Sequence, residues 1–513
     1  MRTRQAFVNA VFSLMLQVVL AISGLLVPRF FIAVYGSAVN GLVSSITQFI
    51  TYLSLVEAGV GAAGTVALYK PLADKDSLRV SGILSATRVF YLRSGLIFAG
   101  LVGLLIIFYP LIVKSEIGDG GFVRLMILLL SLSGIIDYFF LGKYRVLLMA
   151  DQRGYVLYGF QIIGTIIMTA LSLWQIHIGC SALIVKATAA AVFIGRSVAA
   201  IIYCKYHYKD YKFNVWPLKE AFTQRNAALV HQIVGAVANN AAPVLLTLMI
   251  KRDALTEVSV YSVYNLVAYS LSTLLTSLTA GLTPSFGEVI SKGEKDVLKS
   301  SYSVYEMVMF LLIFVCYVCM ALLLYPFIAL YSAQFNDSTS YVRIELVVLF
   351  TLAGVLQSIR HPALTVICAA GHYKETQSRA IIELVISLVF SLALTPKFGV
   401  AGVMMAMCLS YLYRTADVVF YSAKRFLEGT LKRTLSRLLR NGITMAGLIT
   451  VGVLLLQHDT TSWFVWIGQA VVIGITSVVV LVLVNFIFEP QEIKGLLKLG
   501  MGILTMGERK STF

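Results

Sequence analysis

The sequence has few charged residues for its length. Asp, Glu, Lys and Arg make up 13% of the 513 residues, whereas 58% are hydrophobic. Soluble domains carry about 25% charged residues, so a water-soluble globule of this size is improbable. Acidic residues are the scarcer sign, 25 against 41 Lys and Arg, which gives a net charge of +16.

The sequence also has few cysteines and lacks the P-loop nucleotide-binding motif. The six cysteines all fall in or at the edge of apolar runs. Cys316 and Cys319 form a C-x-x-C without a second pair or a nearby His, so we interpret them as packing residues. No G-x-x-x-x-G-K-[ST] occurs, which disfavours an ATP-driven mechanism within this chain. We therefore expect no metal site and no resident cofactor.

Long apolar runs dominate what is present. Each is long enough to cross a bilayer, which takes roughly 20 helical residues. We identify fourteen, with approximate centres at residues 20, 53, 95, 134, 165, 192, 238, 271, 314, 354, 386, 411, 448 and 475. The sequence thus predicts an all-α, polytopic membrane protein with about 14 transmembrane helices.

The basic residues are sorted to one side of these spans. If the connections alternate between two sides, 28 of the 41 Lys and Arg lie on the side of the N-terminus and four on the other. By the positive-inside rule the richer side is cytoplasmic, so both termini are predicted to face the cytoplasm. Orientation and anionic lipid heads explain the positive charge, and no nucleic-acid partner is expected.

The longest connections divide the chain, and both are predicted to be cytoplasmic. The second, around residues 422–440, interleaves leucines with basic residues and is expected to form an amphipathic helix at the inner interface. The predicted parts are an N-terminal lobe of spans one to six (1–204), a linker (205–225), a C-terminal lobe of spans seven to twelve (226–423), and a segment with the amphipathic helix, spans thirteen and fourteen and a cytoplasmic tail (424–513).

Charged groups inside the spans need a reason, because each costs about 2.5–3.5 kcal/mol at mid-membrane on insertion scales. We expect Arg414 to pair with Asp417, three residues along the same helix. Arg88 and Arg93 are interpreted as partners of Asp137, and Arg145 is expected to snorkel to the interface. The deep set comprises Arg29, Glu57, Arg88, Arg93, Asp137, Arg360, Glu383, Arg414 and Asp417.

Several spans also carry a polar face that exceeds what packing requires. These faces include Asn239, Asn240, Tyr261, Asn265 and Gln357. They predict a solvated central cavity. Arginine in such a cavity favours an anion, because guanidinium holds phosphate oxygens through a planar fork and stays charged. We place Arg29 and Arg360 there. Glu57, on the polar second span, either hydrogen-bonds a neighbouring helix or binds a proton or sodium ion.

Four stretches carry a family resemblance. They are Leu26–Gly36 (LVPRFFIAVYG), Leu55–Gly61 (LVEAGVG), Val260–Asn265 (VYSVYN) and Pro284–Glu288 (PSFGE). Their order and the topology resemble the O-antigen-type flippases, bacterial polysaccharide-repeat exporters of the multidrug/oligosaccharidyl-lipid/polysaccharide superfamily. The resemblance implies two six-helix lobes in a V, plus two C-terminal helices, in the bacterial cytoplasmic membrane.

The resemblance also implies a cargo, undecaprenyl-pyrophosphate-linked oligosaccharide, which moves from the inner to the outer leaflet by alternating access. Membrane lipids surround such a protein, and a polymerase and glycosyltransferases of the same pathway are its implied partners. Arg29 and Arg360 would attract the pyrophosphate, while Asn239, Asn240, Tyr261, Asn265 and Gln357 would face the sugars. Glu57, Asp137 and Glu383 are the candidates for coupling to H⁺ or Na⁺.

Two other functions compete. A cation-coupled multidrug antiporter of the same superfamily would present carboxylates in its cavity, and four deep acids against five arginines discriminate only mildly. A membrane glycan polymerase would need a sizeable outer loop or domain, and the short outer connections argue against one. We therefore expect a transporter and not an enzyme.

Overall fold

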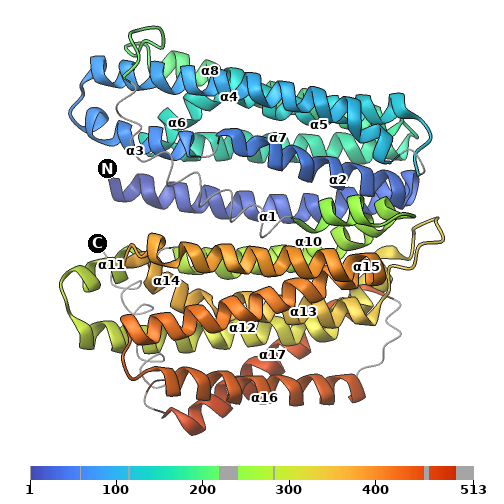
Figure 1. The fold of residues 1–513 in the computed structure, drawn as a ribbon, viewed down its shortest axis with the longest axis vertical. Helices are drawn as coiled ribbons and strands as arrows, with labels where there is room; N and C mark the ends of the chain where they lie inside the picture. The colour runs from blue at the N-terminus through green and yellow to red at the C-terminus, as the bar shows by residue number, and fades with distance from the viewer. Residues whose placement is uncertain are drawn as a thin grey trace. The chain divides into compact units, whose positions relative to one another are not determined.

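The computed structural model describes residues 2–57, 59–113, 116–218, 241–280, 283–455, 462–490 and 492. Every regular element in these ranges is helical, which confirms the predicted all-α class (Figure 1). The chain forms two compact units. Unit 1 comprises Met1–Ser262 and Gln334–Thr339, and unit 2 comprises Val263–Ala333 and Ser340–Phe513.

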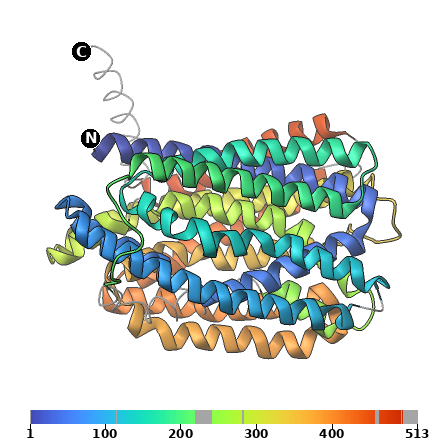
Figure 2. The ribbon, with the colours of Figure 1, turned by 90° about the horizontal axis from the view of Figure 1, so that it is seen from above.

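Unit 1 is built from long helices with short connections. α1 packs along α7, and α7 packs along α8 (Figures 1 and 2). The elements are α1 (Arg2–Tyr35), α2 (Ser37–Leu53), the 3₁₀-helix η1 (Ser54–Glu57), α3 (Val60–Ala73), α4 (Ser77–Ile112), α5 (Gly120–Ile136), the π-helix η2 (Asp137–Leu141), α6 (Gly142–Ala150), α7 (Gly154–His177), α8 (Ala182–His207) and the start of α10 (Ala254–Ala280).

Unit 2 continues α10 and contains the longest helices. Both C-terminal helices pack against α12. The elements are α11 (Thr283–Ser291), α12 (Lys295–Ser332), α13 (Ile344–Ile359), α14 (His361–Ala369), α15 (Tyr373–Arg425), α16 (Leu431–Leu455) and α17 (Trp463–Phe488).

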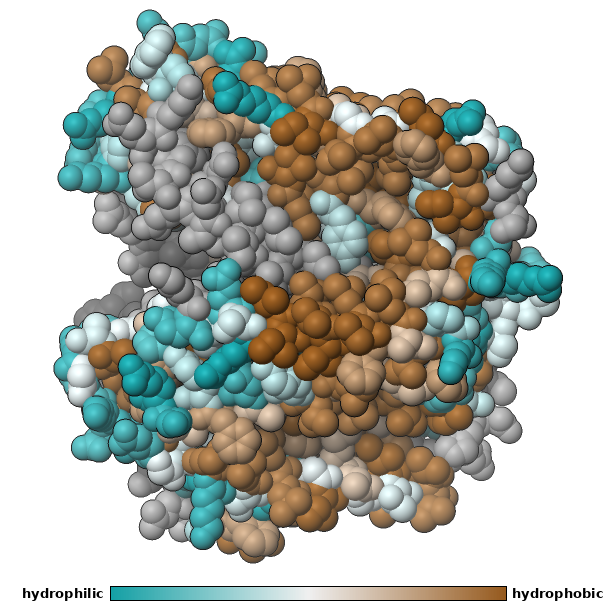
Figure 3. All heavy atoms as spheres, viewed as in Figure 1, coloured by the Kyte–Doolittle hydropathy of each residue, from teal (hydrophilic) through white to brown (hydrophobic). Residues whose placement is uncertain are grey.

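Twelve helical stretches in the described residues are long and apolar enough to cross a membrane. Thirteen of the fourteen predicted span centres fall in described helices, and the centre at 238 lies outside the described residues. In each unit, hydrophobic residues cover the middle of the helices and hydrophilic ones gather at the ends (Figure 3). The protein is a multi-pass membrane protein.

α15 contains two predicted spans that fold back on each other. A straight helix of 53 residues would be about 80 Å long, far more than a bilayer needs. Gly399 interrupts it with φ 57° and ψ −131°. A Cβ on Gly402 would lie 2.5 Å from the Leu394 carbonyl oxygen, so the two halves approach backbone to backbone. Glycine therefore permits the tight reversal.

Contacts within unit 1 agree with the predicted alternation of sides. The Tyr35 hydroxyl donates to the Cys180 carbonyl, and both residues belong to connections predicted to be external. At the other end, the side-chain amide of Asn9 donates to the Gln152 carbonyl, 2.8 Å away. Connections predicted to share a side thus lie together.

The core of unit 1 lies between α2, α4 and α5, around Leu42, Leu84 and Ile127, which are completely buried. A Cβ on Gly41 would lie 1.6 Å from the Leu255 carbonyl oxygen, so α2 reaches the start of α10 only because residue 41 has no side chain. This close approach holds the first turns of α10 in unit 1.

The expected interfacial helix at residues 422–440 is absent. Residues up to Arg425 end α15, and Leu431–Arg440 form the first turns of the membrane-length helix α16. Arg437 is completely buried there and does not face lipid headgroups. The amphipathic pattern was misleading because the basic face of this segment contacts buried acidic residues rather than water.

Candidate functional site

The second span is broken near its middle, and neighbouring helices satisfy the broken backbone. α2 passes into the 3₁₀-helix η1, and Gly59 then takes a left-handed conformation with φ 84° before α3 begins. The Tyr138 hydroxyl donates to the Ser54 carbonyl at 2.8 Å, and the Ser94 hydroxyl donates to the Val56 carbonyl at 3.3 Å. A broken helix is tolerated in a membrane where such donors replace the lost bonds.

Glu57, at the end of η1, belongs to a four-residue polar cluster. Its carboxylate accepts a hydrogen bond from the Tyr91 hydroxyl at 2.6 Å and forms an ion pair with Arg145 at 3.0 Å. The other arm of the Arg145 guanidinium pairs with Asp137 at 2.8 Å. The structure therefore brings together two of the predicted ion-coupling residues, Glu57 and Asp137, through one arginine.

The partners predicted for Asp137 were wrong. Arg145 takes that place, and Arg88 instead donates to the Phe213 carbonyl at 3.4 Å. Arg145 does not snorkel, because its guanidinium is held between two carboxylates. Asp137 and Arg145 are eight residues apart, which is two turns plus about 80° on a regular α-helix, so their side chains would point in different directions. The wider π-helix η2 absorbs part of that difference. A sequence prediction that assumes a regular α-helix therefore misses this pairing.

A second chain of charges lies in unit 2. Arg360, between α13 and α14, pairs with Glu383 at 2.6 Å and lies over the Tyr411 ring. Arg414 contacts the other Glu383 oxygen at 3.6 Å. Arg414 also pairs with Asp417 at 2.8 Å, which confirms the predicted pair. A predicted anion-binding residue, Arg360, is thus neutralised by a predicted coupling residue, Glu383.

The remaining predicted residues are dispersed over both units. Arg29 is half-buried in α1 next to Pro28, and Tyr261 is buried in the part of α10 that belongs to unit 1. Asn265 on α10 and Gln357 on α13 are half-buried in unit 2. Asn239 and Asn240 lie outside the described residues. The roles given to these six residues stay predictions.

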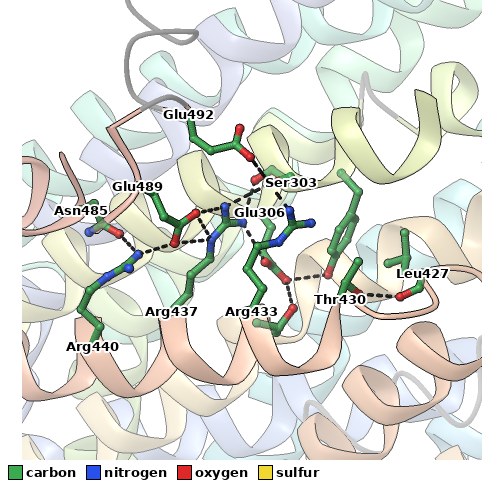
Figure 4. A network of polar contacts seen from close by, with 12 residues as sticks. Ser303, Glu306, Leu427, Thr430, Arg433, Arg437, Arg440, Asn485, Glu489 and Glu492 are labelled. Carbon is green, nitrogen blue, oxygen red and sulfur yellow. Dashed lines mark hydrogen bonds and ion pairs between the residues drawn. The ribbon is translucent and has the colours of Figure 1, made fainter. Parts of the chain in front are cut away.

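The span pattern missed a third network, which joins the C-terminal helices to α12. Arg437 pairs with Glu306 at 3.0 Å and also with Glu489, and Arg440 pairs with Glu489 at 2.9 Å. The three arginines of α16 that Figure 4 labels extend from one side of the helix towards these acids. The sequence did hold one signal for this network. Glu306 is a lone carboxylate in a strongly apolar run, and such a group needs a partner inside the membrane.

The pKa of Glu489 makes this network sensitive to acid. Burial raises the pKa, but hydrogen bonds from Arg437 and Arg440 outweigh it and hold the pKa below its ordinary value of 4.5. The stability that Glu489 contributes is therefore complete above pH 4.5 and is lost as the pH falls through the lower, folded-state pKa.

We expect the melting temperatures of wild type and Glu489→Gln in nanodiscs to differ by a constant amount above pH 4.5 and to converge below it. The exposed Glu288, paired with Lys292 on the surface of α11, provides the matched control Glu288→Gln. A wild-type advantage over Glu489→Gln that persists unchanged down to about pH 3 would contradict the depressed pKa.

Comparisons with known proteins find matches among solved structures only. No family model matches, and no curated protein matches. Among solved structures, a lipid II flippase, MurJ, in its inward closed conformation has a TM-score of 0.72 and 16% identity, over 94% of this chain and 99% of that one. An inward-facing multidrug resistance MATE transporter of the MOP superfamily has a TM-score of 0.61 and 13% identity, over 83% of this chain and 99% of that one.

A third solved structure, a mutant of the Vibrio cholerae MATE transporter VcmN, has a TM-score of 0.53 and 16% identity, over 83% of this chain and 98% of that one. Identities this low establish the fold alone. The chain therefore has the fold of these MATE transporters and of the lipid II flippase.

Proposed function

We propose that this protein is a flippase for polyprenyl-pyrophosphate-linked oligosaccharides in the bacterial cytoplasmic membrane. It moves its cargo from the inner to the outer leaflet by alternating access of two lobes. Glycosyltransferases that build the cargo and a polymerase that uses it are the proposed pathway partners. The observation that carries the proposal is the fold, with charges held inside both units.

The extent of the structural likeness supports a lipid-linked cargo. The lipid II flippase matches 94% of the chain and the multidrug transporter 83%. The likeness to the flippase therefore extends over more of this chain and has the higher TM-score, 0.72 against 0.61.

The Arg360–Glu383 pair supplies a way to couple cargo to a cation. A pyrophosphate oxygen would compete with the Glu383 carboxylate for the Arg360 guanidinium, since both are acceptors for the same planar fork. Cargo binding would then leave Glu383 without one of its two arginines and favour its taking up H⁺ or Na⁺. Glu57 and Asp137, which share Arg145, are the corresponding groups of unit 1.

A cation-coupled multidrug antiporter is the second candidate. The likeness to MATE transporters favours it, as do the carboxylates inside both units. Each of those carboxylates is paired with arginine, however, and a guanidinium beside the site repels an organic cation. Everted vesicles that accumulate ethidium in exchange for protons would support this candidate over the flippase.

Arg29→Ala is expected to abolish glycolipid flipping. The half-buried guanidinium on α1 is the proposed unit 1 contact for pyrophosphate, and alanine removes its fork. The measurement is the rate at which labelled undecaprenyl-pyrophosphate-N-acetylglucosamine changes leaflet in proteoliposomes. Arg93→Ala, which removes an exposed arginine of α4, is the matched control and should flip at the wild-type rate.

Both variants should insert into membranes as well as the wild type does. Normal flipping by Arg29→Ala would show that Arg29 is not the contact for the pyrophosphate. Failure of the wild type to flip this lipid, together with ethidium exchange, would overturn the proposed function.

A further inference from the structure

Unit 1 contains a partly open cavity beside the Asp137–Arg145 ion pair, for which no occupant has yet been proposed. It has a volume of about 430 Å³ and lies between the end of α5, the η2–α6 segment, the first part of α7 and the second half of α8. Its polar lining includes Asp137, Arg145, Gln161 and Arg196. Its aromatic lining consists of Tyr158, Phe160 and Phe193. Charged groups around a space of this size, within helices long enough to span a membrane, indicate a polar occupant.

The hydrogen-bonding groups of this cavity are of two kinds. One carboxylate oxygen of Asp137 pairs with Arg145 at 2.8 Å, whereas the other, Oδ1, is buried and has no hydrogen-bond partner among the residues that the structure describes. Arg196 lies with its guanidinium carbon 4.4 Å from the centre of the Phe193 ring. A guanidinium held by its face still presents N–H donors around its edge. The cavity therefore offers an acceptor and a set of donors.

These groups select among chemical classes of occupant. A phosphate brings acceptors, which suit Arg196 but repel the free oxygen of Asp137. An alkali or organic cation suits Asp137 but meets Arg145 and Arg196. A hydroxyl group both donates and accepts, so a neutral polyol satisfies both kinds of group at once. The aromatic side chains offer apolar surface to the C–H faces of a sugar ring.

We propose that this cavity is a sugar-binding subsite for one residue of the glycan as it crosses the membrane. Asp137 accepts a hydroxyl donor, while Arg196 and Gln161 donate to ring or hydroxyl oxygens. This inference rests on the proposed flippase function and deepens it. It gives the glycan a binding site inside unit 1 that is separate from the arginines proposed for the pyrophosphate. Water is the alternative occupant of the same polar groups.

Binding of free sugars tests the subsite without any transport. The full-length protein in nanodiscs is probed by saturation-transfer NMR with the methyl glycosides of glucose, galactose, rhamnose and N-acetylglucosamine. We expect transfer to at least one glycoside from the wild type. Arg196→Met and Gln161→Leu should each weaken it about tenfold, the loss expected for one hydrogen bond to a charged group or within a buried site.

The control is Arg124→Met, which makes the same substitution at an exposed arginine of α5 and should bind as the wild type does. Gln161→Leu changes no charge, so it keeps the test valid if Arg196→Met fails to fold. Absence of transfer to all four glycosides from the wild type would overturn the subsite and leave water as the occupant. Equal transfer from wild type and both variants would overturn it too.

A flipping assay separates this proposal from the proposed function. Undecaprenyl pyrophosphate with and without one N-acetylglucosamine is supplied to proteoliposomes. The subsite predicts that both variants lower the rate on the glycosylated lipid about tenfold relative to the sugar-free lipid. Equal slowing of both lipids, with glycoside binding unaffected, overturns the subsite and leaves the flippase. Glycoside binding that depends on Arg196, in a protein that flips neither lipid, supports the subsite and overturns the flippase.

Discussion

Arg145→Met is expected to stop transport, with a fall in the initial rate of roughly a hundredfold, because both carboxylates of the unit 1 cluster lose their counter-charge inside the membrane. Arg145 bridges Glu57 at 3.0 Å and Asp137 at 2.8 Å. It thereby ties the broken second span to the π-helix η2 of the fourth. The measurement is glycolipid flipping in proteoliposomes, with the melting temperature recorded in parallel.

Two further variants separate a structural role of this cluster from a functional one. Arg145→Lys keeps the charge but loses the fork that reaches both acids, so it should recover only part of the rate. The triple variant Glu57→Gln/Asp137→Asn/Arg145→Met removes every charge and should regain the melting temperature while remaining inactive. Wild-type flipping by the triple variant would show that the cluster serves packing alone.

Arg437→Met is expected to destabilise unit 2 by about 3–5 kcal/mol, the usual cost of leaving a buried charge without its partner. Arg437 and Glu306 are both fully buried and lie 3.0 Å apart. The Thr434 and Tyr302 hydroxyls that donate to Glu306 cannot replace a positive charge. The measurement is the melting temperature in nanodiscs, together with protease access to the segment after α15.

The exposed Lys432, five residues earlier on α16, supplies the control Lys432→Met, which should melt as the wild type does. The double variant Arg437→Met/Glu306→Gln removes both charges and should recover most of the lost stability. If the double variant is as unstable as Arg437→Met alone, the uncompensated charge is not the cause of the loss.

The sequence predicted the secondary structure and one ion pair of the charged residues inside unit 2. Apolar length located thirteen described spans, since helix length in a bilayer is set by the thickness of the hydrocarbon. The Arg414–Asp417 pair was also predictable, because residues three apart on one helix are neighbours whatever surrounds them. Both inferences use local geometry, and local geometry follows from the order of residues.

The pairings between helices required the tertiary structure. The sequence placed Arg145 at a membrane interface and the basic run of Arg433 to Arg440 on an amphipathic helix at the inner interface. The structure turns Arg145 towards Glu57 and Asp137 through a π-helix, and it buries Arg437 against Glu306. A charge pattern along a helix shows which residues share a face, and the facing helix decides whether that face meets water, lipid or carboxylates. Spans, apolar character and sorted charges were therefore determined by the sequence itself, whereas the partners of the buried charges were decided only by packing.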